Sequence, residues 1–294
     1  MRDRTGHSGG AFGSSTPHDQ PDGTIDINTA HTSRIYDYLL GGTNHFAVDR
    51  EVAQHAFATW PGGVDGARAD ARANRAFLGR VVSHLAGEAG IRQFLDIGTG
   101  IPNEDNVHAV AQQTVSSCRI VYVDNDPIVL AHSHAMLRSH PRGATAYVHA
   151  DLREPDVILK KAATTLDLLQ PIGLVLIGLL HVIPDEDDPY GCVSQLVDAV
   201  APGSYLAISH VTNEVEPDGM SKVEERLDRT MRASNPPAFR SQAELARFFE
   251  GLELIEPGIV PVNSWRPDDG LPPPSQHPAR RCPVYGGVAR KPLP

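Results

Sequence analysis

The stretch "FLDIGTGIP", residues 94–102, holds residue types suited to binding a ligand. They are the carboxylate of Asp96 and the glycines Gly98 and Gly100, which let the backbone come close to a ligand because no Cβ stands in the way. A second acid, Asp124 in "VYVDND", ends the next apolar run, and such a carboxylate can accept hydrogen bonds from both hydroxyls of a ribose. The pattern therefore predicts a site for a ligand that contains a ribose.

The same stretch departs from the pattern that binds a dinucleotide. That pattern has Gly or Ala at the place of Asn103, where the following helix must pack closely and carry a pyrophosphate. Asp96 would also repel a pyrophosphate and attract an ammonium group. A ligand with a ribose and an amine but no phosphate therefore fits better than NAD does. S-adenosylmethionine is such a ligand.

Parallel strands must bring Asp96 and Asp124 together. After Gly90, apolar runs alternate with helical stretches, which is typical of a parallel sheet covered on both faces. We expect an α/β fold with a Rossmann-like, doubly wound, mostly parallel seven-stranded sheet. The expected strands are residues 91–98, 119–124, 145–150, 172–178, 204–210, 252–260 and 282–290, the last near the sheet edge, and the expected helices of this part are 106–113, 127–139, 154–162, 190–201 and 241–250.

Further helices are expected ahead of the sheet, within residues 32–87. The longest has one apolar face because its apolar residues recur at three- and four-residue steps. That face consists of Phe77, Leu78, Val81, Val82 and Leu85. We expect residues 1–27 to form a disordered tail, residues 28–88 a helical cap and residues 89–294 the ligand-binding domain.

The composition indicates which classes of partner and which cellular compartment to expect. The net charge of −10 disfavours a nucleic-acid partner, although it leaves room for a local basic patch. The three cysteines are widely spaced and fit neither a disulfide framework nor a zinc site. The longest apolar run, residues 171–180, is half the ~20 residues that a membrane helix needs. We expect a cytoplasmic protein without a membrane partner, and its oligomeric state stays open.

Five motifs follow one another along the chain: "DIGTG", "YVDNDP", "HADLREP", "LIGLLHVIPDED" and "VAPGSYLAISHVT". In this order they resemble the motifs of class I S-adenosylmethionine-dependent methyltransferases. With "RIYDYLLGGTNHFAVDRE" upstream and "GLELIEPGIVPVNSWRPD" downstream, the chain is similar to an actinobacterial S-adenosyl methyltransferase family long known as a domain of unknown function. The likeness spans roughly residues 28–290 and implies a class I methyltransferase domain.

The resemblance implies roles for individual residues. Asp96 would hold the amine of the cofactor's methionine end, and Asp124 the ribose diol. Asn125, Asp151 and Leu152 would border the adenine. Asp124 and Asp151 could instead be acids that cap a turn at a strand end. The full set of expected cofactor-binding residues is Asp96, Gly98, Thr99, Gly100, Asp124, Asn125, Asp151, Leu152 and Gly178.

Three side chains are candidates for the acceptor side of the reaction. Methyl transfer from a sulfonium needs in-line positioning, and a base only where the acceptor must lose a proton. His181 follows the fourth strand and could be that base, or could pack beneath the cofactor. Arg75 could reach an anionic acceptor or form a surface ion pair. Trp265 could wall the acceptor pocket or pack a loop.

No metal site is expected. The acidic run at residues 185–188 is typical of a solvated helix start. His132 and His134 stand two apart on an expected helix and therefore point to different faces. We expect neither group to bind a metal ion.

The segment "SRIYDYLLGGTNHFAVDRE", residues 33–51, joins two expected helices through a pair of glycines. A class I methyltransferase leaves the methyl group exposed at the top of its sheet unless something covers it, and we expect this segment to be that cover. The alternative is a plain helix–helix turn, with Gly41 as the first residue beyond the helix. The expected covering residues are Tyr36, Tyr38, Gly42, Asn44 and Phe46.

The sequence is thus interpreted as a methyltransferase that uses S-adenosylmethionine, releases S-adenosylhomocysteine and acts on a small-molecule acceptor. Two alternatives remain. One is a non-catalytic protein that binds either nucleoside and uses its helical cap for a partner. The other is an NAD-dependent oxidoreductase.

Overall fold

The computed structural model describes residues 26–102, 105–136, 139–231, 237–267 and 281–294. Residues 1–25 of the predicted tail, nearly all of the proline-rich loop and Asn103 lie outside these ranges. In the described ranges, no helix combines the length and the apolar character needed to cross a membrane.

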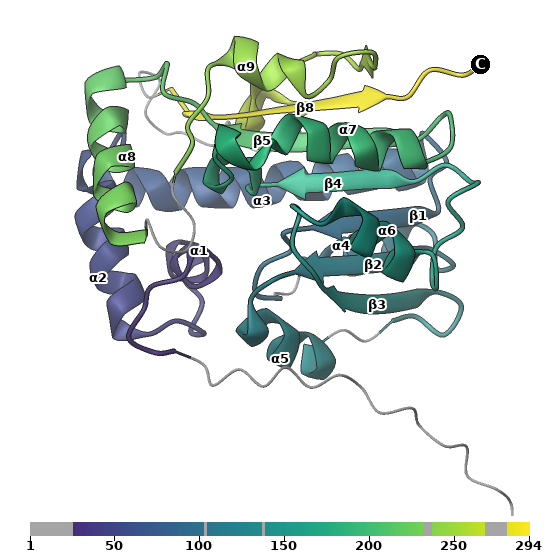
Figure 1. The fold of residues 1–294 in the computed structure, drawn as a ribbon, viewed down its shortest axis with the longest axis horizontal. Helices are drawn as coiled ribbons and strands as arrows, with labels where there is room; N and C mark the ends of the chain where they lie inside the picture. Colours follow the sequence, from purple (N-terminus) through teal and green to yellow (C-terminus); the bar gives the residue numbers. More distant parts are fainter. Residues whose placement is uncertain (1–25, 103–104, 137–138, 232–236, 268–280) are drawn as a thin grey trace, which may run out of the picture.

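Eight strands form one sheet, in the order β3-β2-β1-β4-β5-β8-β6, with β7 also paired to β8 (Figure 1). The first five strands pair in parallel, and β8 runs antiparallel to β5, β6 and β7. The strands are β1 (Gln93–Ile97), β2 (Arg119–Asp124), β3 (Ala144–His149), β4 (Gly173–Ile177), β5 (Tyr205–Val211), β6 (Glu253–Leu254), β7 (Val260–Pro261) and β8 (Val284–Arg290). The predicted Rossmann-like, mostly parallel α/β fold is confirmed.

The prediction of seven strands was wrong at the antiparallel edge. The stretch 252–260 was expected to be one strand, but a turn that includes Pro257 divides it into the short strands β6 and β7. Proline has no backbone N–H to donate to a sheet, so Pro257 disfavours continuous pairing along this stretch. The last strand, β8, lies near the edge as predicted, between β5 and the edge strand β6.

Both faces of the sheet are covered, as its apolar strands require. Neighbouring residues of β1 point to opposite faces: Phe94 belongs to one apolar cluster and Leu95 to the other. In Figure 1, α6, α7 and α9 lie on one face, and α3 and α4 on the other. These helices and the one that follows β2 are α3 (Gly63–Gly87), α4 (Val107–Thr114), α5 (Pro127–Met136), α6 (Pro155–Ala162), α7 (Pro189–Ala199) and α9 (Gln242–Arg247).

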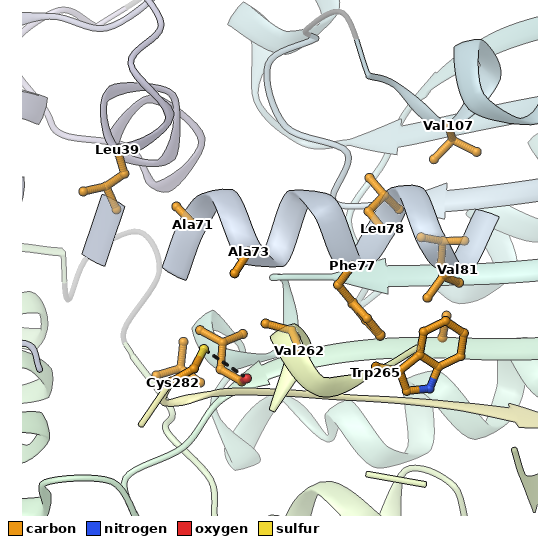
Figure 2. Close-up of a cluster of buried hydrophobic side chains, with 14 of the residues drawn as sticks. Leu39, Ala71, Ala73, Phe77, Leu78, Val81, Val107, Val262, Trp265 and Cys282 are labelled. Carbon is orange, nitrogen blue, oxygen red and sulfur yellow. Dashed lines mark hydrogen bonds between the residues drawn. The ribbon is translucent and has the colours of Figure 1, made fainter. Parts of the chain in front are cut away.

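Helix α3 positions one wall of the site by packing along the sheet. The predicted apolar face of this helix is buried, and its Phe77 meets Trp265 edge to face (Figure 2). A Cβ added to Gly286 in β8 would lie 2.6 Å from Phe77, so only glycine allows this close approach. Because α3 packs on the sheet, its contacts cross the predicted domain boundary at residue 88.

Four further helical segments gather at the carboxyl ends of the parallel strands (Figure 1). They are α1 (Thr32–Leu40), α2 (Ala47–Ala56), η1 (Phe57–Thr59) and α8 (Pro217–Met231). Helix α8 is not among the predicted helices, although its apolar residues recur at three- and four-residue steps. Those residues are Met220, Val223, Leu227 and Met231, which join the same apolar cluster as α3.

Candidate functional site

A cavity of about 190 Å³ opens at the carboxyl ends of β1, β2, β4 and β5. The strand order reverses between β1 and β4, and open α/β sheets bind their ligands at such a switch point. Residues of α1, η1, α3 and α8 line the other side of the cavity. The cavity therefore lies between the sheet and the helices above it.

The glycine turn after β1 forms one wall of the cavity. Gly98 has φ 73° and Gly100 has φ 67°, backbone conformations that favour glycine. The backbone N–H of Gly98 donates to the carbonyl of Val123 over 2.8 Å, which holds the turn against β2. A Cβ at Gly98 would lie 2.7 Å from the side chain of Leu179, so the turn has no room for a side chain there.

Asp96 stands just before this turn and is only 5% exposed. Burial raises the pKa of its carboxyl group to about 7, against the opposing effects of the Arg75 charge and a hydrogen bond with Thr99. An ammonium group in the cavity would favour the ionised carboxylate. The environment of Asp96 therefore fits the binding of a cationic amine.

Asp124 ends β2 and links the strand to the glycine turn. Its Oδ2 accepts a hydrogen bond from the backbone N–H of Gly100 over 2.8 Å, and its Oδ1 accepts one from that of Asp126 over 2.9 Å. Burial raises the pKa of this carboxyl group above its ordinary value. Each carboxylate oxygen has two lone pairs, so both can still accept a hydroxyl.

Asn125, Asp151 and Leu152 line the cavity together. The Nδ2 of Asn125 donates to Oδ2 of Asp151 over 2.6 Å, and Arg153 donates to both oxygens of the same carboxylate. Although burial opposes it, these hydrogen bonds hold the pKa of Asp151 below its ordinary value. Asp151 thus already stabilises its own turn, the alternative that the sequence left open, while Leu152 offers an apolar surface.

His181 and His210 both line the cavity and differ in their bonding. The Nδ1 of His210 lies 2.7 Å from the carbonyl of Val211 and must carry the proton, because a carbonyl only accepts. Its Nε2 then accepts from Arg240 over 3.1 Å. His181 has no side-chain hydrogen bond within the described ranges, and burial together with Arg240 lowers its pKa to about 4. His181 is therefore a neutral imidazole with a lone pair to offer.

The family model of S-adenosyl methyltransferases matches residues 18–292 of the chain. The chain belongs to this family. A protein of the DUF574 family from Streptomyces avermitilis has a similar structure, with a TM-score of 0.83 and 44% identity, over 92% of this chain and 100% of that chain. A candidate methyltransferase from Thermobifida fusca has a TM-score of 0.81 and 36% identity, over 91% and 97%. A search among curated proteins finds no match.

Membership in the S-adenosyl methyltransferase family makes this chain a methyltransferase, with S-adenosylmethionine as its cofactor. All nine predicted cofactor-binding residues of this methyltransferase line the cavity. His181 and Arg75 line it as well. The NH2 of Arg75 donates to the carbonyl of Asp105 and to Oδ1 of Asn106, each over 2.9 Å, so Arg75 ties α3 to the loop before α4.

The covering segment of this S-adenosyl methyltransferase differs from the expectation. Of the five predicted covering residues, Tyr36 alone is among the cavity-lining residues, and its hydroxyl bonds to Ala71 and Asn74. The other four lie beside Asp37 or Arg68, or pack on the apolar cluster of Ile101, Ile128 and Val129. They are Tyr38, Gly42, Asn44 and Phe46. Gly41, with φ 87°, caps α1 as the alternative interpretation proposed.

Trp265 does not line the cavity. It is fully buried between α3 and the sheet, where it packs on Phe77 and His84 (Figure 2). Its assignment to an acceptor pocket was therefore wrong, and the alternative that it packs a loop describes its place. A large aromatic side chain in a loop is often drawn into the nearest apolar core.

Several cavity residues were missed by the sequence analysis. His31 precedes α1 and pairs its Nδ1 with Oδ2 of Asp126 over 3.0 Å, which ties α1 to the loop after β2. Leu227 and Phe239 come from α8 and the segment after it. The apolar spacing of α8 was the available signal, whereas no local pattern distinguishes His31.

Two residues of the acidic run have assigned contacts in the structure. Asp188 caps α7 by accepting a hydrogen bond from the backbone N–H of Gly191, and Asp185 pairs with Arg240. Among the described residues no three metal-ligand side chains come together. The side chain of His134 lies outside the described part of the chain, so no contact with His132 is assigned.

Proposed function

We propose that this methyltransferase transfers the methyl group of S-adenosylmethionine to a small-molecule acceptor held between the sheet and the helical cap. One observation carries the proposal: a single cavity joins the Asp96–Asp124 end to a space lined by α1, α3 and α8. The cofactor supplies a methyl group on a positively charged sulfur. The chain's own residues have to hold both reactants in line.

The cofactor end is assigned by charge and geometry. Asp96 binds the methionine amine, since its buried carboxyl group is stabilised in the ionised form by a cation. The glycine turn leaves room for the ligand against the backbone, and Asp124 accepts the ribose hydroxyls with its remaining lone pairs. Asn125 and Leu152 border the adenine. Arg75 places a positive charge near Asp96, where the cofactor carboxylate would lie.

The acceptor end is assigned to the space beneath the cap. Leu39 of α1, Trp60 just after η1 and Leu227 of α8 line it. A space enclosed by helices suits a small molecule better than a polymer, and the net charge of −10 adds no attraction for nucleic acid. His181 is proposed as the group that accepts the acceptor's proton.

Transfer of a radiolabelled methyl group tests the proposal. The protein is incubated with labelled S-adenosylmethionine and an extract of small metabolites freed of macromolecules. Label in a small molecule is expected, and the Asp124→Ala variant should transfer much less. Tight binding of S-adenosylhomocysteine without transfer into any acceptor pool would instead favour the non-catalytic binding protein.

The oxidoreductase alternative has a separate test. Asp96 and Asp124 both stand at the glycine turn, and their two buried carboxyl groups oppose a pyrophosphate there. Calorimetry should therefore show much tighter binding of S-adenosylhomocysteine than of NAD. Equal affinities for the two ligands would revive the oxidoreductase.

A further inference from the structure

The part of the cavity away from Asp96 is strongly apolar. We call it the cap chamber, and its defining residues come from α1, from the position after η1, from α8 and from the segment after α8. The residues that define it are Ile35, Leu39, Trp60, Leu227, Met231 and Phe239. A ligand that fills the chamber gains free energy by burying apolar surface, at about 25 cal/mol per Å².

The hydroxyl of Tyr36 and the indole N–H of Trp60 are already bonded to the protein at the cap chamber. The hydroxyl of Tyr36 donates to the carbonyl of Ala71 over 3.1 Å and accepts from Nδ2 of Asn74. The indole N–H of Trp60 donates to Oδ2 of Asp70 over 2.8 Å. The Tyr36 hydroxyl and the Trp60 indole close the chamber without offering a charge to a ligand. An uncharged ligand would leave this bonding intact.

His181 is different from these groups. It lines the cavity beside Phe239, with ring centroids 6.4 Å apart, and its ring makes no hydrogen bond within the described ranges. Its Nδ1 is buried, so Nε2 is the nitrogen that a ligand can reach. His210, next to it, has both nitrogens bonded. His181 therefore stands ready to accept one hydrogen bond from a ligand in the chamber.

The charges around the cavity disfavour an anionic acceptor. Its lining includes four carboxyl groups, those of Asp70, Asp96, Asp124 and Asp151. On the described part of the lining, Arg75 is the one arginine, and it binds the loop before α4. A cationic acceptor is disfavoured for another reason, since it would stand close to the sulfonium of the cofactor.

We propose, on the basis of the function above, that the acceptor is an uncharged and mainly apolar small molecule with one reacting hydroxyl or N–H group. It fills the cap chamber and points this group at Nε2 of His181. The oxygen or nitrogen forms a bond to the methyl carbon as the carbon–sulfur bond breaks and its electron pair goes to sulfur. The proton passes to Nε2 of His181 and then to water.

Three probes that share one naphthol ring system test the charge preference. Protein saturated with sinefungin, a cofactor analogue that carries an ammonium group in place of the sulfonium, is titrated by calorimetry with 2-naphthol, with 6-hydroxy-2-naphthoate and with 6-(aminomethyl)-2-naphthol. We expect 2-naphthol to bind at least about tenfold more tightly than either charged analogue. Equal or tighter binding of a charged probe, or no binding of 2-naphthol, would overturn the proposal.

Matched variants of α8 test the location. Leu227→Trp should fill the chamber and abolish 2-naphthol binding, while Lys222→Trp on the exposed face of the same helix should not. Both variants should keep their affinity for S-adenosylhomocysteine. Unchanged 2-naphthol binding in Leu227→Trp would show that the probe binds elsewhere.

Naphthalene, which has no hydroxyl group, tests the role of His181. Wild-type protein should prefer 2-naphthol to naphthalene, His181→Leu should lose this preference, and His181→Gln should keep part of it because glutamine retains an acceptor. A preference that survives in His181→Leu would contradict the assignment. Binding of S-adenosylhomocysteine is measured first in every protein: its absence would contradict the proposed function, whereas its presence with no probe preference contradicts the acceptor class alone.

Discussion

Asp96 is a buried carboxyl group whose surroundings do not fully replace the water that it has lost. The positive charge of Arg75 favours its ionised form, whereas Asp124 on the neighbouring strand disfavours it. The result is a pKa of about 7, compared with 3.8 in an exposed group. A bound ammonium group would shift this balance toward the carboxylate.

Cofactor affinity should therefore depend on pH. Between pH 6 and 8, binding of the amine requires Asp96 to release its proton, so affinity for S-adenosylhomocysteine should rise with pH, by up to about tenfold per unit below the pKa of about 7. Calorimetry in buffers of different ionisation enthalpy measures this proton release. Asp96→Asn should bind weakly and without this dependence. A wild-type affinity that is flat over this range would remove the assigned role.

The same pKa shift has the opposite effect on the ligand-free protein. The folded state binds more protons than the unfolded state between pH 3.8 and about 7, so this group makes the free energy of unfolding fall as the pH rises through that window. At pH 8 the ligand-free Asp96→Asn variant should thus melt at a higher temperature than wild type. If the variant melts at a lower temperature than wild type, the buried carboxylate of Asp96 does not destabilise the ligand-free protein, and the prediction is wrong.

Replacement of Asp124 tests its assignment to the ribose of the cofactor. Asp124→Ala should lower the affinity for S-adenosylhomocysteine by ~1–3 kcal/mol, the range for hydrogen bonds to a charged group. Since it also removes the acceptor for the backbone amides of Gly100 and Asp126, circular dichroism must establish that the variant is folded. Unchanged affinity in a folded variant would exclude Asp124 from the ribose site.

At the scale of elements, α1 closes one side of the cavity and is tied to the cofactor loop by the His31–Asp126 pair. A second pair of the same kind, His45 with Asp37 at 2.9 Å, lies in the same helical region and outside the cavity lining. The two pairs have similar nitrogen–oxygen distances, but only the first contributes a residue to the cavity lining. They therefore form a matched comparison.

His31→Ala should weaken the binding of S-adenosylhomocysteine and lower the free energy of unfolding by about 1–3 kcal/mol, because the buried carboxylate of Asp126 loses its partner. His45→Ala should also destabilise the protein but leave the affinity unchanged. Chemical denaturation and calorimetry measure the two effects. If both variants lose affinity equally, α1 has no particular role in closing the site.

Strands, helices and site residues could be predicted from the sequence where a local pattern specifies them. Asp96 and Asp124 were found because parallel strands end at one edge of a sheet, so acids at two strand ends must be neighbours. The direction in which the side chains of Tyr38 and Phe46 point could not be predicted, since it depends on how α1 packs against α2 and α3. Trp265 was misassigned for the same reason: its partner Phe77 is far away in the sequence.

At the scale of the whole molecule, two apolar layers hold the sheet and leave its switch point open to the cap. The parallel direction of the first five strands follows from the alternation of strands and helices, and this part was predicted correctly. The antiparallel edge was not, because β6 and β7 are too short to show a periodic pattern. Helix α8 has such a pattern, and reading it would have placed Leu227 on an apolar face.

A crystal structure with S-adenosylhomocysteine tests the assignment of the site most directly. The ligand should lie across the carboxyl ends of β1 and β2, with its amine within hydrogen-bond distance of Asp96 and both ribose hydroxyls at the carboxylate of Asp124. Its sulfur should face the cap chamber and His181. A ligand bound elsewhere, or one whose ribose does not touch Asp124, would contradict the proposed site.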